Sequence, residues 1–101
     1  MAKEFLLDKR DALRSATAFH EAGRYAEGVA LLAAAHERFG DDAMLLYDLA
    51  CFESLDGRTT DALAHVRRAV ELDPGTRAAI AVDSDFAALA DDAEFRALVG
   101  G

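Results

Sequence analysis

The fold of this chain is indicated most clearly by residues 43–76, which read AMLLYDLACFESLDGRTTDALAHVRRAVELDPGT. Apolar residues recur at helical spacing on both sides of Gly57, as in two amphipathic helices. Glycine suits the left-handed backbone that ends a helix, and Pro74 ends the second segment because its ring cannot continue one. The stretch therefore predicts two antiparallel helices joined by a tight turn.

The composition of the whole chain extends this prediction to an all-α fold. The 101 residues include 23 Ala and 13 Leu but only ten β-branched residues and one Pro. Ala and Leu favour helices, whereas β-branched residues favour strands. We expect helices over about 3–22, 25–39, 43–55 and 60–72, followed by shorter helical segments over 76–82, 86–89 and 91–99.

Short polar residues mark where several of these helices begin. Asp41 and Asp42 are predicted N-caps of the third helix, and Thr59 or Thr60 of the fourth. Asp91, with Glu94 three residues later, resembles a capping box at the start of the last helix.

The chain also repeats itself with a period of 34 residues. The glycines of two predicted turns coincide in this register, and so do small residues of the predicted helices. Among the identical pairs are Ala16 and Ala50, Gly23 and Gly57, Arg24 and Arg58, Ala30 and Ala64, Ala35 and Ala69, and Glu37 and Glu71. A helix–turn–helix unit of this length is typical of tetratricopeptide repeats.

The second copy resembles the tetratricopeptide family closely, in Leu46, Leu49, Ala50, Gly57, Ala62, Val66, Ala69 and the closing Leu72-Asp73-Pro74. The first copy departs from the family pattern. It carries Ala12 and Ser15 where bulky residues are usual, Gly28 where Ala is usual, and Gly40 in place of proline. Phe19 keeps an aromatic residue that the second copy replaces with Glu53.

The resemblance implies one domain over 1–101, in which antiparallel hairpins stack as a short right-handed solenoid. Repeat one would cover about 9–42, repeat two about 43–76, and a C-terminal capping segment about 77–101. The first helix of each repeat lines the concave groove in this family. The groove residues would be Arg10, Leu13, Thr17 and His20 in the first copy and Met44, Tyr47, Cys51 and Ser54 in the second.

Such a groove suits a peptide or helix of a partner protein, so we expect a non-enzymatic interaction module. Tyr47 and Arg10 would contribute most of the binding energy, with Met44 adding adaptable apolar contact. Family members that bind chaperone C-termini have Lys and Asn where this chain has Leu13 and Thr17, so that activity is not predicted. Two alternatives stay open: a homodimeric self-assembly unit, and packing of these residues beneath the C-terminal segment.

The charge balance narrows the class of partner. Nineteen acidic residues face eleven Lys and Arg, giving a formal net charge of −8. This balance argues against nucleic acid and anionic membranes as partners, and favours a partner with a basic or apolar face. No apolar run approaches the length of a membrane span or a signal peptide. With one cysteine and no internal disulfide possible, we expect a cytoplasmic protein.

No residue pattern predicts catalysis, a cofactor or a metal site. Cys51 and His20 lie on the first helices of the repeats, but no third group that would orient the histidine is apparent. His36 and His65 lie 29 positions apart, and neither has a second metal ligand at close spacing.

The segment after residue 76 is predicted to fold back over the fourth helix and to cover its apolar face. A terminal repeat exposes such a face unless a polar-backed cap covers it. The apolar residues available for this are Ile80, Val82, Phe86, Leu89, Phe95, Leu98 and Val99.

Overall fold

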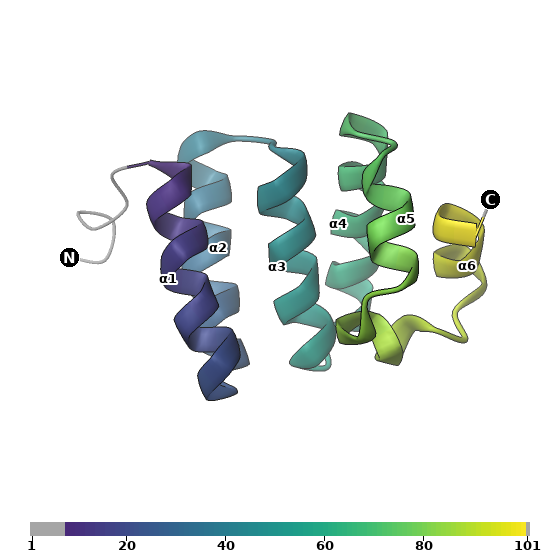
Figure 1. Ribbon diagram of the computed structural model, residues 1–101, viewed down its shortest axis with the longest axis horizontal. Coiled ribbons are helices and arrows are strands. Elements are labelled where there is room, and N and C mark those ends of the chain that lie inside the picture. Colours follow the sequence, from purple (N-terminus) through teal and green to yellow (C-terminus); the bar gives the residue numbers. More distant parts are fainter. Residues whose placement is uncertain (1–7, 101) are drawn as a thin grey trace.

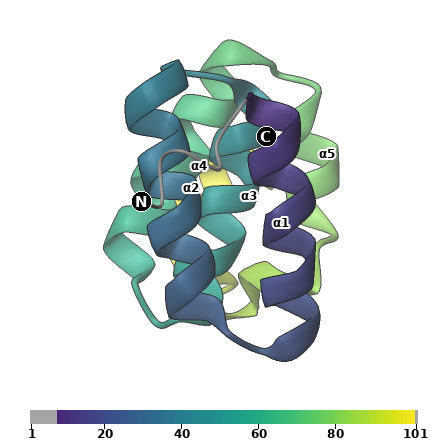
Figure 2. The ribbon, with the colours of Figure 1, turned by 90° about the vertical axis from the view of Figure 1, so that its left-hand side faces the viewer.

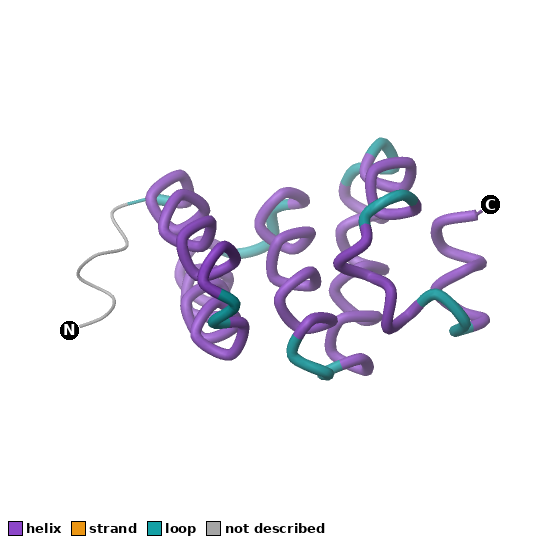
Figure 3. Tube along the Cα trace, turned by 60° about the horizontal axis from the view of Figure 1, so that its bottom comes forward, coloured by secondary structure: helices purple, strands orange, loops and turns teal. Residues whose placement is uncertain are grey.

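The computed structural model describes residues 8–100 and is helical throughout this range, with no strand. The all-α prediction is therefore confirmed. Short loops join the helices (Figure 3). In chain order the elements are α1 (Lys9–Ala22), α2 (Tyr25–Phe39), α3 (Ala43–Leu55), α4 (Thr59–Leu72), α5 (Thr76–Ala81), the 3₁₀-helix η2 (Ser84–Leu89) and α6 (Ala93–Gly100).

The first four helices form two hairpins with the same internal spacing. α1 and α3 begin 34 positions apart, as do α2 and α4. The turns also match, since Gly23 and Gly57 have φ values of +72° and +79°. In each turn the next backbone N–H, that of Arg24 or Arg58, donates to a carbonyl five residues back, at 2.9 and 2.8 Å. The repeated turn is thus set by left-handed glycine and backbone hydrogen bonds.

The helices lie in two layers. α1 packs against α2, α2 against α3, and α3 against α4, so the hairpins stand side by side. Figure 1 shows α1 in front of α2 and α5 in front of α4, and Figure 2 shows the same division end-on. α1, α3 and α5 therefore form one layer, and α2 and α4 the other. Within residues 8–100 no helix combines the length and apolar character that a bilayer span requires.

α3 is the centre of the core. It contacts α1, α2, α4, α5 and η2, and its buried residues point to several sides. Glycine at position 28 of α2 lets the Phe52 ring of α3 approach closely, since a β-carbon there would collide with the ring. The close approach explains why the first copy has Gly28 where Ala is usual.

The C-terminal segment packs differently from the prediction. α5 and α6 contact α4, but η2 packs mainly on α3, with the Phe86 ring edge-on to Tyr47 at 5.9 Å. Phe86 and Phe95 are buried as predicted, whereas Val82 is 86% exposed. The reason is the break at Asp83, where the helix ends and the chain turns toward α3.

Several predicted helix starts need correction. Asp42 caps α3 as predicted, its side chain accepting from the Leu45 N–H. No side chain caps α4: it begins at Thr59 itself, directly after the Gly57 turn. Asp92, rather than Asp91, accepts the Phe95 N–H at 2.9 Å. The first helix begins at Lys9 with Asp8 as its cap, and the part of the prediction over 3–7 lies outside the described residues.

Candidate functional site

A pocket of about 280 Å³ lies between α1 and α3 and is closed on one side by the turn from α5 into η2. Its wall combines apolar side chains, four carboxylates and one histidine, and it contains no Lys or Arg. The lining residues are Leu13, Ala16, Thr17, His20, Glu21, Tyr47, Asp48, Cys51, Phe52, Asp83 and Asp85.

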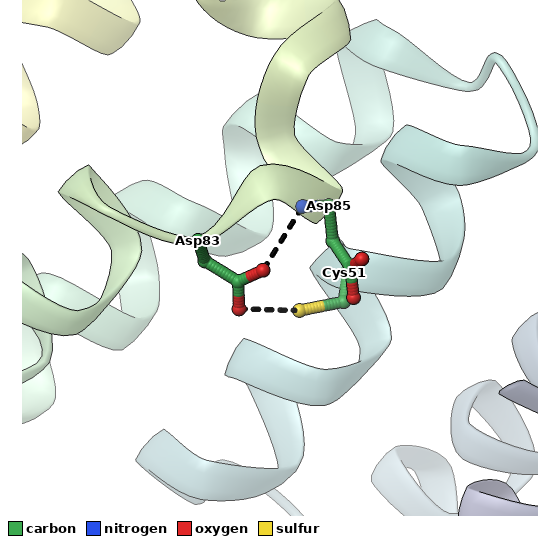
Figure 4. A group of neighbouring side chains, drawn as sticks. All are labelled: Cys51, Asp83 and Asp85. Carbon is green, nitrogen blue, oxygen red and sulfur yellow. Dashed lines mark hydrogen bonds between the residues drawn. The ribbon is translucent and has the colours of Figure 1, made fainter.

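Two aspartates hold the C-terminal segment against this pocket. Asp83 Oδ2 accepts a hydrogen bond from the Tyr47 hydroxyl at 2.6 Å and one from the Cys51 thiol at 3.8 Å. Its Oδ1 accepts the backbone N–H of Asp85 at 2.9 Å, which caps η2 (Figure 4). Asp85 Oδ2 accepts from His20 Nε2 at 2.8 Å. The segment is thereby linked to both α1 and α3.

Asp48 is the partly buried carboxylate of the pocket that takes part in none of these hydrogen bonds, whereas Glu21 is exposed. Asp48 lies on α3, and no donor within residues 8–100 makes a hydrogen bond to it. Burial and the negative charge of Asp83 raise the pKa of Asp48 to about 6, and His20 opposes this only in part. Asp48 is thus ionised at neutral pH at an energetic cost, which a cation would reduce.

Cys51 and Tyr47 keep their protons in this environment. Burial, followed by the charges of Asp83 and its neighbours, raises the pKa of the Cys51 thiol far above its usual range. Burial and the hydrogen bond to Asp83 raise the pKa of Tyr47 as well. Since the thiol donates to Asp83 and His20 donates to Asp85, the two side chains do not form a nucleophile–base pair.

Cys51, Asp83 and Asp85 offer three potential metal ligands within 4.8 Å of one another (Figure 4). However, Asp83 is already engaged by a phenol, a thiol and a backbone amide. These bonds account for the present arrangement without an ion.

Five of the eight predicted groove residues line the pocket: Leu13, Thr17, His20, Tyr47 and Cys51. Arg10 and Met44 are exposed at the starts of α1 and α3 and do not line it, Met44 being 57% exposed. Ser54 is 3% exposed, and its hydroxyl has no hydrogen-bond partner among residues 8–100.

The pocket also contains residues that the sequence interpretation did not select. Asp83 and Asp85 lie in the gap between the predicted helical segments 76–82 and 86–89. Which residues of α3 these two aspartates contact depends on how the chain turns after α5. Asp48 directly follows Tyr47 in the sequence, and a carboxylate placed between Leu46 and Leu49 on a mostly buried helix was the available signal.

No protein-family model matches this chain, and no curated protein or solved structure matches it either.

Proposed function

We propose that this chain is a non-enzymatic protein-interaction module. The pocket between α1 and α3 would bind a basic side chain, Lys or Arg, from a peptide or helix of a partner protein. The observation that carries the proposal is the Asp48 carboxylate, which is partly buried, has no hydrogen-bond partner in the described range and faces a pocket without Lys or Arg.

The charge of the pocket favours a cation. Glu21, Asp48, Asp83 and Asp85 contribute carboxylates, and His20 is the one lining side chain able to carry positive charge. A Lys or Arg head group would pair with Asp48 and lower the cost of keeping it ionised. The overall net charge of −8 adds long-range attraction for a basic segment.

The apolar residues of the pocket fit the rest of such a side chain. Leu13 and Ala16 of α1 and Phe52 of α3 line it. Lys and Arg carry methylene stems that pack on apolar surface while the charged end stays near polar groups. Apolar walls with a few acidic groups match this combination better than they match a phosphate or a carboxylate.

The architecture is the second support for an interaction role. The 34-residue spacing of helix starts and the matching Gly23 and Gly57 turns favour a tetratricopeptide-like arrangement. In such an arrangement α1 and α3 are the groove-lining helices, and the pocket lies between these two.

The proposal is tested with three small probes: the blocked amides of arginine, lysine and norleucine. Norleucine has the lysine stem without the charge, so it isolates the contribution of the cation. We expect arginine and lysine amides to shift NMR signals of pocket residues such as Leu13 and Tyr47, and norleucine amide to shift them far less.

Asp48→Asn is the matched variant, because it removes the charge and keeps the shape. It should abolish the arginine and lysine effects, and acidification below the Asp48 pKa of about 6 should weaken them in the wild type. Equal binding of norleucine would show an apolar groove instead. The proposal would be refuted if no probe binds and if Asp48→Asn captures a partner protein as well as the wild type does.

Self-assembly is retained as a second candidate because of a hollow at the other end of the molecule. Ala81, Ala90, Phe95, Ala97 and Val99 line it together with Arg96 and Gly100. This largely apolar surface is the place where a second copy would dock. Light scattering over a concentration series tests it: a constant monomer mass removes the homodimer, and a rising mass that Ala97→Glu abolishes supports it.

A further inference from the structure

Two histidines far apart in the sequence meet on the layer opposite the pocket. His36 of α2 and His65 of α4 have ring centres 5.8 Å apart, with the rings at 82° to each other. Both side chains are partly accessible, at 30% and 26% of their surface. The two residues are 29 positions apart in the sequence, so ligand patterns of close spacing do not include them.

Each histidine is oriented by its own carboxylate. His36 Nε2 donates to Asp41 Oδ1 at 2.8 Å, and His65 Nδ1 donates to Glu53 Oε1 at 2.6 Å. Glu53 is buried, so its carboxylate holds the His65 ring firmly. These bonds leave His36 Nδ1 and His65 Nε2 as the nitrogens with free lone pairs. A carboxylate behind each imidazole is the usual support of metal-binding histidines in proteins.

The separation of the rings is close to what a shared metal requires. With Zn–N bonds of about 2.0–2.1 Å, each ring centre lies about 3 Å from the ion, and tetrahedral geometry puts the centres about 5 Å apart. The observed centre-to-centre distance of 5.8 Å is somewhat longer, so the rings must move closer and turn their free nitrogens toward a common ion. The surrounding charge also suits a cation, since Glu53, Asp41 and Asp61 act on His65 and Arg68 is paired with Asp41 and Glu71.

We propose that His36 and His65 form a two-imidazole binding site for a divalent transition-metal ion of the Zn²⁺ class. Water, or a ligand from a bound partner, would fill the remaining positions. The site joins α2 to α4 and is independent of the pocket between α1 and α3. Zn²⁺ and protons compete for the same imidazoles, so binding strengthens as the pH rises from 6 to 8.

Calorimetric titration of the full chain with Zn²⁺ tests the site. We expect one equivalent to bind, and His36→Gln and His65→Gln each to abolish this binding. His20→Gln is the matched control, because His20 also has a carboxylate partner but no neighbouring histidine at this distance. Asp41→Asn, which removes the carboxylate behind His36 and leaves both imidazoles in place, should weaken binding by about tenfold.

Two results would overturn the proposal. One is undiminished Zn²⁺ binding by folded His36→Gln. The other is loss of binding in Cys51→Ala, which would place the ion at Cys51, Asp83 and Asp85 instead. Co²⁺ gives an independent readout, because a thiolate-to-metal absorption band appears only when Cys51 is a ligand. Circular dichroism confirms that each variant is folded, and His36→Gln decides the test if His65→Gln unfolds.

Discussion

The two hairpins have matching backbones and different surroundings. α1 buries only Ala12 and Ala16, whereas α3, at the same register, buries eight residues. The first hairpin contacts a neighbour on one side, while the second lies between the first hairpin and the C-terminal segment. Position in the stack therefore decides how much of an equivalent helix is buried.

The difference extends to the chemistry of equivalent positions. Glu53 and His65 form a largely buried pair in the second hairpin, and the first has Phe19 and Leu31 at the corresponding positions. Likewise, the partly buried Asp48 corresponds to the exposed Arg14. The repeat thus supplies a common scaffold, and its departures from repetition hold the polar groups that could recognise a ligand.

The largest effect is expected where the C-terminal segment covers the second hairpin. Phe86→Ala should lower the free energy of unfolding by about 3–5 kcal/mol, because the ring is buried against Tyr47 and Phe95. Phe19→Ala is the same deletion in the first hairpin at a partly exposed site. It should cost less than about 2 kcal/mol. Urea denaturation measures both free energies of unfolding. Equal losses would contradict the difference in burial between the two hairpins.

Replacing Glu53 and His65 by the residues at the equivalent positions of the first hairpin should give the next largest effect on stability. His65→Leu alone should destabilise the protein by about 2–4 kcal/mol, since it leaves the buried Glu53 carboxylate unpaired. Adding Glu53→Phe recreates the apolar pair of the first hairpin and should restore most of the loss. Thermal and urea unfolding in the presence of a chelator measure this. A double variant no more stable than His65→Leu would show that the two sites are not interchangeable.

Gly28→Ala should lower the free energy of unfolding, by less than the changes above and in the direction opposite to the usual one for this substitution. Gly-to-Ala changes inside a helix normally stabilise by about 1 kcal/mol. Here we expect a loss of about 1–3 kcal/mol, because the added methyl group collides with the Phe52 ring. Combining it with Phe52→Leu should recover part of that loss. A stabilised single variant would mean that the hairpins separate without cost.

The smallest expected change is a gain in stability. The carboxyl of Asp48 has a pKa of about 6 in the folded chain, above its unfolded value, so ionisation above pH 6 works against folding. Asp48→Asn should therefore stabilise the protein by about 1–2 kcal/mol at pH 7. The gain should shrink as the pH falls from 6 toward 4, where the wild-type carboxyl is protonated. Urea denaturation of the wild type and of Asp48→Asn at pH 7 and at pH 4.5 measures the gain at each pH.

Much of the fold was predictable because it rests on local signals. Helical spacing, the Gly57 turn and Pro74 fix where the hairpins begin and end, and the 34-residue register places equivalent helices alike. The caps at Thr59 and Asp91 were predicted wrongly, since a backbone-bonded turn or a neighbouring aspartate served equally well. Which of two neighbouring residues caps a helix depends on small differences in local backbone geometry.

The candidate sites were less predictable because they depend on contacts between distant segments. Leu13 and Tyr47, which occupy equivalent positions in the 34-residue register, both line the pocket. Nothing in the sequence gives the direction that the chain takes after Asp83, and that direction decides which carboxylates reach Tyr47 and His20. The meeting of His36 and His65 likewise depends on how the two hairpins are placed side by side, with α2 and α4 in the same layer.

The break at Asp83 also bears on how many binding sites one molecule offers to a partner. α5 begins close to 34 positions after α3 and lies in the same layer, but it ends at Ala81. The chain then turns, and Asp83 and Asp85 close one side of the α1–α3 pocket. Under the proposed function, each copy would offer this pocket as one site for a basic side chain. A single site gives no avidity by itself, so strong attachment to a partner with many basic segments would require several copies brought together.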